Sequence, residues 1–126
     1  MWRMSLLRNH MLKWHNMTPY PTKYCLLTDL TEMKKWAKKN KVGIAEPEPN
    51  TLGGVYAAGS YIFVLVNPDQ SRWNLVDTLI HESVHVFQGA MEYVGETVLG
   101  KETQAYHIAN IAINLMKDFH ALHSDK

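Results

Sequence analysis

The longest unbroken apolar run of the chain, Tyr61–Val66, has the sequence YIFVLV. Its aromatic and β-branched residues favour a β-strand, and it is far shorter than the roughly 20 residues of a membrane-spanning helix. Gly53-Gly54 introduces a second short run, and Gly59-Ser60 marks a turn between the two. We therefore predict a β-hairpin over about residues 55–66, which ends at Asn67-Pro68-Asp69 because proline cannot donate to a strand ladder.

The rest of the chain shows helical periodicity, with apolar residues recurring at spacings of three and four. It predicts helices over about residues 3–15, from Asp29 to a stop at Gly43, over about 74–88 with a stop at Gly89, and over about 101–122. Residues 16–23 contain two prolines and are predicted to be an extended loop. Helices beside one hairpin indicate an α+β fold.

Length and composition place this fold in one domain. The chain has 126 residues, 46% of them hydrophobic and 20% charged, which is typical of a single globular domain over residues 1–126. The net charge of +1 favours neither nucleic acid nor an anionic membrane as a partner. Residues 34–41 hold a cluster of lysines, which we interpret as a solvated helix face; association with DNA through this face is the weaker alternative.

Cysteine content and the N-terminus bear on the compartment. Cys25 is the single cysteine, which excludes an intrachain disulfide and any CxxC-type zinc site, so a zinc ion here must use His and carboxylate ligands. The first residues lack the apolar segment of a secretory signal. We expect a cytoplasmic protein without a membrane segment.

The chemistry-bearing motif is His81-Glu82-Ser83-Val84-His85, which matches HExxH within a predicted helix. Residues four apart lie one above the other on a helix, so His81 and His85 can direct two imidazoles at one metal ion. Zinc suits such a pair, because it accepts imidazole nitrogens and carboxylate oxygens and leaves a position for water. Glu82 is then predicted to act as the general base on a zinc-bound water.

A catalytic zinc usually has three protein ligands, and the His₂Glu class takes a glutamate from downstream. Glu102 is our prediction for this ligand, because it opens the last predicted helix and small Ala105 allows a close helix approach. An acidic residue also suits the first turn of any helix, so a purely structural role for Glu102 stays open. The other candidates are Glu92, Glu96, His107 and His120.

The segment around HExxH, followed by Glu102-Thr103-Gln104-Ala105-Tyr106, resembles small zincin metallopeptidases of the gluzincin type, the compact HExxH…ExxA(Y/F) zinc peptidases of bacteria and phages. The resemblance covers about residues 61–110. It implies a minimal zincin-like fold, with the HExxH helix and a glutamate helix packed on a small antiparallel sheet. It also implies zinc on His81, His85 and Glu102, and peptide-bond hydrolysis with Glu82 as base.

The resemblance further implies that the strand before the active helix is an edge strand along which a peptide substrate lies, which would place Tyr61, Phe63 and Leu65 beside it. Thermolysin-like members carry an acidic residue where this chain has Tyr106, and no third histidine follows at metzincin spacing. Tyr106 or His107 could stabilise the transition state, or Tyr106 could be a packing aromatic.

The function expected from the sequence is thus a zinc metallopeptidase that hydrolyses peptide bonds in a protein or peptide substrate. The alternative is a catalytically inactive, metal-stabilised binding or assembly module, because so short a chain leaves little room for a second subdomain to close a deep cleft.

Overall fold

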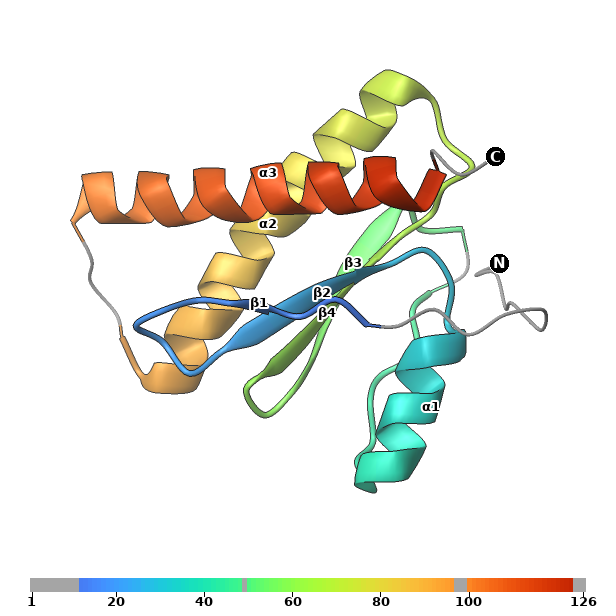
Figure 1. Cartoon of the computed structure of the whole chain (residues 1–126), viewed down its shortest axis with the longest axis horizontal. Coiled ribbons are helices and arrows are strands. Elements are labelled where there is room, and N and C mark those ends of the chain that lie inside the picture. The colour runs from blue at the N-terminus through green and yellow to red at the C-terminus, as the bar shows by residue number, and fades with distance from the viewer. Residues whose placement is uncertain (1–11, 49, 97–99, 124–126) are drawn as a thin grey trace.

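The computed structural model describes residues 12–48, 50–96 and 100–123. Within them the order of elements is β1 (His15–Asn16), β2 (Lys23–Leu27), α1 (Thr31–Asn40), β3 (Gly53–Ala58), β4 (Tyr61–Val66), α2 (Arg72–Val94) and α3 (Lys101–His123). Figure 1 shows α2 and α3 crossing each other beside the sheet, with α1 set apart from them. The α+β class predicted from the sequence is confirmed.

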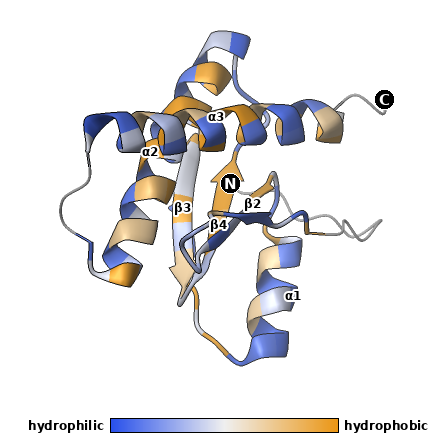
Figure 2. Cartoon of the chain, turned by 60° about the vertical axis from the view of Figure 1, so that its left-hand side comes forward, coloured by the Kyte–Doolittle hydropathy of each residue, from blue (hydrophilic) through white to orange (hydrophobic). Residues whose placement is uncertain are grey.

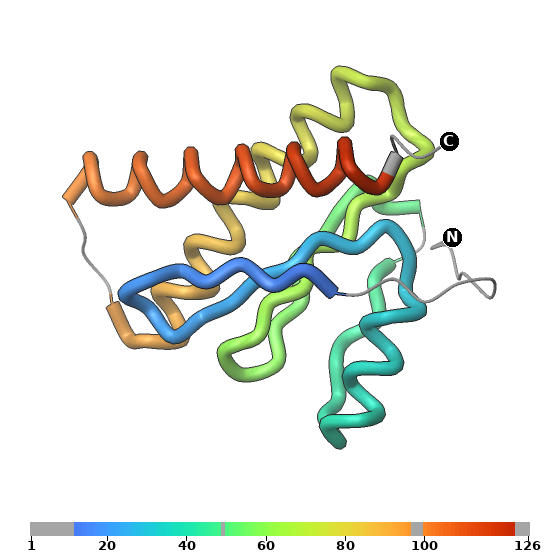
Figure 3. The backbone as a smooth tube through the Cα atoms, viewed as in Figure 1, coloured from blue at the N-terminus to red at the C-terminus, as the bar shows by residue number. Residues whose placement is uncertain are grey.

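The strands form one mixed sheet in the order β1-β2-β4-β3. β3 and β4 pair antiparallel as the predicted hairpin, and Gly53 is the register partner of Val66. β2 lies on the other side of β4 and runs parallel to it, while β1 pairs antiparallel with β2. The tube in Figure 3 shows a short connection, residues 67–71, that joins the end of the β3–β4 hairpin to the start of α2.

Alternation along the strands divides the core into two layers, because successive side chains of a strand point to opposite faces of the sheet. Even-numbered residues of β4, such as Ile62 and Val64, pack with α2 and α3. Odd-numbered residues, such as Phe63 and Leu65, pack with Met33 of α1. Both faces of β4 are therefore covered, which explains its unbroken apolar sequence. In Figure 2 the helices carry both hydrophilic and hydrophobic colours, as expected of elements with one face on a core.

Helix α2 is longer than the sequence predicted. It begins after Ser71, whose hydroxyl accepts a hydrogen bond from the backbone N–H of Asn74 at 3.2 Å, and it ends at Gly95, where φ is 74°. The predicted stop at Gly89 is wrong. A Cβ at Gly89 would meet the Cδ1 atom of Ile62 at 3.4 Å, so this glycine lies where the helix approaches the sheet rather than where it ends.

Three other predictions need correction. The sheet is mixed rather than antiparallel, because the unpredicted strand β2 pairs with β4 in parallel. The predicted helix over 3–15 falls mainly outside the described residues, but its end is wrong, since His15–Asn16 forms β1. The helix from Asp29 ends at Asn40 instead of Gly43, because Lys41 adopts a left-handed conformation with φ of 56°.

The helix predicted over 101–122 is confirmed as α3, Lys101–His123. Its residues Ile111 and Leu115 are buried in the layer that α2 also covers. Across the described residues no helix has the length and apolar character to cross a membrane.

Candidate metal site and groove

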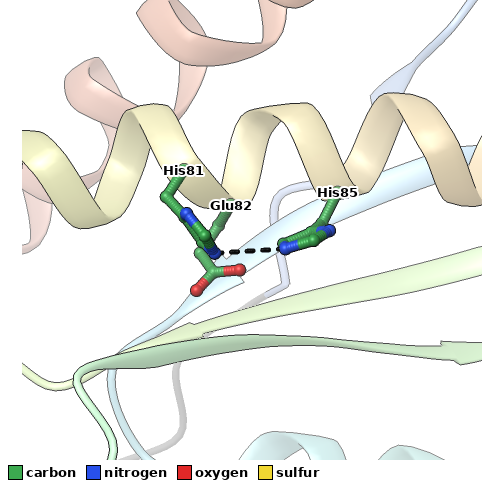
Figure 4. A group of neighbouring side chains, drawn as sticks. All are labelled: His81, Glu82 and His85. Atoms are coloured by element: carbon green, nitrogen blue, oxygen red, sulfur yellow. Dashed lines mark hydrogen bonds between the residues drawn. The ribbon is translucent and has the colours of Figure 1, made fainter.

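The middle of α2 brings the HExxH residues together. The Nε2 atoms of His81 and His85 lie 3.1 Å apart, and both imidazoles are exposed. Two nitrogens bound tetrahedrally at roughly 2.0–2.1 Å from zinc lie about 3.3 Å from each other. The imidazole pair therefore has nearly the spacing that one zinc ion requires. Figure 4 shows both rings on the same side of the helix, with the Glu82 carboxylate beside them.

Gln88, which was not predicted from the sequence to take part in the site, contacts one of these imidazoles. The side-chain oxygen of Gln88 lies 2.9 Å from Nδ1 of His85. An amide oxygen can only accept, so Nδ1 of His85 is the donor, and Nε2 of His85 accepts the 3.1 Å hydrogen bond from Nε2 of His81. The Nε2 lone pair of His85 thus points at the position that a metal would take. Gln88 follows His85 by one helical turn, and this i,i+3 spacing was the available signal.

Glu82 differs from the two histidines in its surroundings, because its exposed fraction is only 5%. Burial raises the pKa of this carboxyl above its ordinary value, and the neighbouring His81 and His85 lower it by less. Ligating atoms of Glu82, His81 and His85 all lie within 4.8 Å of one another. A carboxyl with a raised pKa beside two imidazoles has the properties of a general base.

Strand β3 approaches Glu82 closely at Gly53. A Cβ at this position would lie 2.9 Å from Oε2 of Glu82 and 2.6 Å from Cγ2 of Thr78. The Thr78 hydroxyl donates to Oε1 of Gln70 at 3.0 Å, and Gln70 in turn donates to the carbonyl of Leu52 at 3.1 Å. This chain of hydrogen bonds connects α2 to the start of β3, so the strand is held beside Glu82.

Between β3 and α2 lies an open groove of about 540 Å³. Its walls are residues 53–57 of the strand on one side and residues of the HExxH helix on the other; the helix residues are His81, Glu82, His85, Gln88, Gly89 and Glu92. Tyr56 belongs to this lining, and burial, followed by the charges of Glu82 and Glu48, raises the pKa of its hydroxyl. The groove presents both a candidate metal site and a length of strand to solvent.

The strand along the groove is β3, and the expectation that Tyr61–Val66 is an edge strand is wrong. β4 lies between β2 and β3, so both of its backbone edges pair within the sheet. Phe63 and Leu65 are fully buried on the α1 side, and the ring centroid of Tyr61 lies 5.1 Å from that of Trp14. The sequence predicted a hairpin alone, and the unpredicted strand β2 makes β4 an interior strand.

The structure does not bring Glu102 to the imidazole pair. Glu102 lies exposed in the first turn of α3, and in the described part of the chain the group of clustered ligating side chains is His81, Glu82 and His85. Glu92 lines the groove without joining this group. Glu96 and His120 neither line the groove nor join the group. The third ligand thus stays a prediction.

Tyr106 and His107 lie in a different hollow, of about 390 Å³, between α3 and the chain around β1 and β2. The Tyr106 side chain is 73% exposed there. The His107 ring lies 5.4 Å from that of Tyr20 and stacks on Phe87 at 6.0 Å. Neither residue lines the groove beside Glu82, so this arrangement gives no support to a role in transition-state stabilisation.

No protein family model matches this chain, and no curated protein or solved structure matches it.

Proposed function

We propose that the chain is a zinc-dependent metallopeptidase that hydrolyses a peptide bond in a protein or peptide substrate. The observation that carries the proposal is the pair of Nε2 atoms 3.1 Å apart on His81 and His85, with the buried carboxyl of Glu82 beside them. Nitrogen and oxygen donors at this spacing fit zinc. Both imidazoles are exposed, so substrate can reach the site.

In this mechanism each residue has a separate task. His81 and His85 would hold the ion, and Gln88 keeps His85 in the tautomer that can bind it. A zinc ion supplies a Lewis acid that allows water to attack a carbonyl at neutral pH. Glu82 accepts the proton of the attacking water and passes it to the leaving amine, a task for which burial raises the carboxyl pKa in the required direction.

The substrate backbone would lie along the free edge of β3, the side of this strand that pairs with no other strand in the described part of the chain. An edge strand offers unpaired N–H and C=O groups to an extended peptide, which gives affinity without dependence on sequence. Gly53 carries no side chain at the level of Glu82, and the ring of Tyr56 lies over the neighbouring Gly54. The edge-strand role first expected for Tyr61–Val66 thus belongs to its neighbour in the sheet.

The test begins with zinc stoichiometry by elemental analysis of the whole chain after excess metal is removed. We expect one zinc per chain in the wild type and in Glu82→Gln, and none in His81→Ala. The variant His120→Ala, which changes an exposed histidine of α3, is the matched control and should keep its zinc. The same measurement on Glu102→Ala decides whether Glu102 is the third ligand, since loss of zinc there would require it.

Hydrolysis is then measured by mass spectrometry on a diverse peptide library. The wild type should cleave and Glu82→Gln should not. Cleavage that survives Glu82→Gln would refute the mechanism. The second candidate function, a metal-stabilised binding module, is favoured by one observation: in the described residues only Glu82 joins the two histidines. Zinc binding without any cleavage would support that candidate.

A further inference from the structure

The strand and the helix that form the groove run in the same direction along it. At one end Gly53 of β3 approaches Glu82 of α2. At the other end Gly89 approaches Ile62, whose register partner is Ala57 of β3. From 53 to 57 the strand rises about 13 Å, and from 82 to 89 the helix rises about 10 Å. Figure 4 shows the helix above strands that run along it.

An extended segment on the free edge of β3 would therefore follow α2 from the imidazole pair towards the C-terminal end of the helix. Gly89 lines the groove along that path. Glu92 is the last helix residue that lines the groove, seven residues beyond His85. Seven helical residues rise about 10 Å, which equals roughly three residues of an extended peptide.

The groove is negatively charged at the end formed by Glu92. Glu92 is exposed, and none of the described residues that line the groove is Lys or Arg. The other carboxyl in the lining is Glu82, which is buried beside the histidines. A basic side chain arriving at Glu92 would thus meet one carboxylate and, among the described lining residues, no competing cation.

We propose that the groove accepts an extended peptide with a Lys or Arg side chain about three residues from the backbone position at His81 and His85, where it pairs with Glu92. This inference names the substrate class for the proposed function and rests on it for cleavage. The pairing itself involves only binding and can be measured without turnover. Glu92 acts here as a specificity determinant and not as a metal ligand.

The experiment uses the whole chain with Glu82→Gln, loaded with zinc, so that peptides are bound but not consumed. The probes are fluorescein-labelled decapeptides of one Ala/Val/Thr background, in which a single Lys, Gln or Glu is moved along the sequence. Fluorescence anisotropy gives Kd for each peptide. An exposed ion pair predicts that Lys at one position binds about two- to fivefold more tightly than Gln there.

Variants of Glu92 decide whether this residue causes the preference for Lys peptides. Glu92→Gln should abolish the preference for Lys, and Glu92→Lys should invert it in favour of Glu peptides. Glu96→Gln removes the same charge just beyond α2 and outside the groove lining, so it should keep the preference. An unchanged preference in Glu92→Gln, or an equal loss in Glu96→Gln, would overturn the inference.

Two further readouts separate this inference from the proposed function. Zinc stoichiometry should be unchanged in Glu92→Gln, and loss of zinc would show that Glu92 is a ligand and overturn its role in specificity. Absence of binding by every peptide would also overturn it. A charge preference that follows Glu92, together with no cleavage by the wild type, would refute hydrolysis while leaving the peptide groove intact.

Discussion

Gly53 is a position where one added carbon should disturb both the fold and the site. In Gly53→Ala the new Cβ would lie 2.6 Å from Cγ2 of Thr78, 2.9 Å from Oε2 of Glu82 and 3.3 Å from the carbonyl oxygen of Leu65. Carbon atoms in contact are ordinarily about 3.5–4.0 Å apart, so β3 and α2 must separate by about 1 Å. The backbone angles of Gly53 suit any residue, so the effect is purely steric.

The neighbours of Gly53 have little freedom to move. Thr78 is held by the 3.0 Å hydrogen bond to Gln70, and Leu65 contributes a backbone atom of the central strand. Overpacking of this kind costs about 1–3 kcal/mol. For a chain of this length we expect the melting temperature to fall by roughly 3–15 °C. Urea denaturation followed by circular dichroism measures the free energy directly.

The matched control is Gly43→Ala. No atom lies within 4 Å of a Cβ built at Gly43, and the stability of this variant should stay within about 0.5 kcal/mol of the wild type. Equal stability of Gly53→Ala and Gly43→Ala would refute the close approach of β3 to Glu82. In a peptidase assay Gly53→Ala should also lower kcat, because the displaced atom belongs to Glu82, the proposed general base.

Three further predictions follow from single contacts. Gln88→Leu should weaken zinc binding by about 10- to 100-fold in isothermal titration, because His85 loses the acceptor that fixes its tautomer, and equal affinity would contradict that role. Gly89→Ala should raise stability by about 0.5–1 kcal/mol, because alanine favours a helix and its Cβ would meet Ile62 at an ordinary 3.4 Å; a lower melting temperature would count against this packing. Burial, followed by the charge of Asp118, raises the pKa of Cys25 far above its ordinary value of 9.0, so the thiol should resist iodoacetamide in the native state and react in urea.

The shift at Cys25 also has a defined sign for stability. A group whose pKa is raised on folding stabilises the native state below its unfolded pKa, and this contribution is lost as pH rises above that value. Between about pH 9 and about pH 10 the wild type should therefore lose about 1 kcal/mol more than Cys25→Ala, measured by urea denaturation at each pH. Equal losses would show that the thiol ionises in the folded chain.

The parts of the fold that the sequence predicted are those decided by local chemistry. Local sequence is enough to determine three of these parts: the β-branched run of β4, the Gly59 turn and the apolar stripe of α3. The prediction ended α2 at the wrong glycine, because a glycine can lie within a helix as well as end it. Gly89 lies inside the helix and faces Ile62 at a distance that a Cβ would also tolerate, whereas at Gly95 a positive φ ends the helix. The sequence contains both glycines and does not show which one packs.

Strand β2 was missed for a related reason. Lys23–Leu27 is short and follows two prolines, so no alternation distinguishes it from a loop. Its burial comes from parallel pairing with β4, a contact between residues far apart in the sequence. Because of this pairing β4 is an interior strand, and β3 is the edge strand beside the groove.

The same distinction explains why the imidazole pair was predictable and the third ligand was not. His81 and His85 share one helix, so their spacing alone determines that they meet. Glu102 belongs to α3, and the side of α2 on which α3 lies is set by packing of Ile111 and Leu115 into the sheet layer. Spacing along the chain carries no information on that choice. The zinc stoichiometry of Glu102→Ala therefore decides whether α3 contributes a ligand to the candidate metal site. Loss of zinc would mean that it does, and retained zinc that it does not.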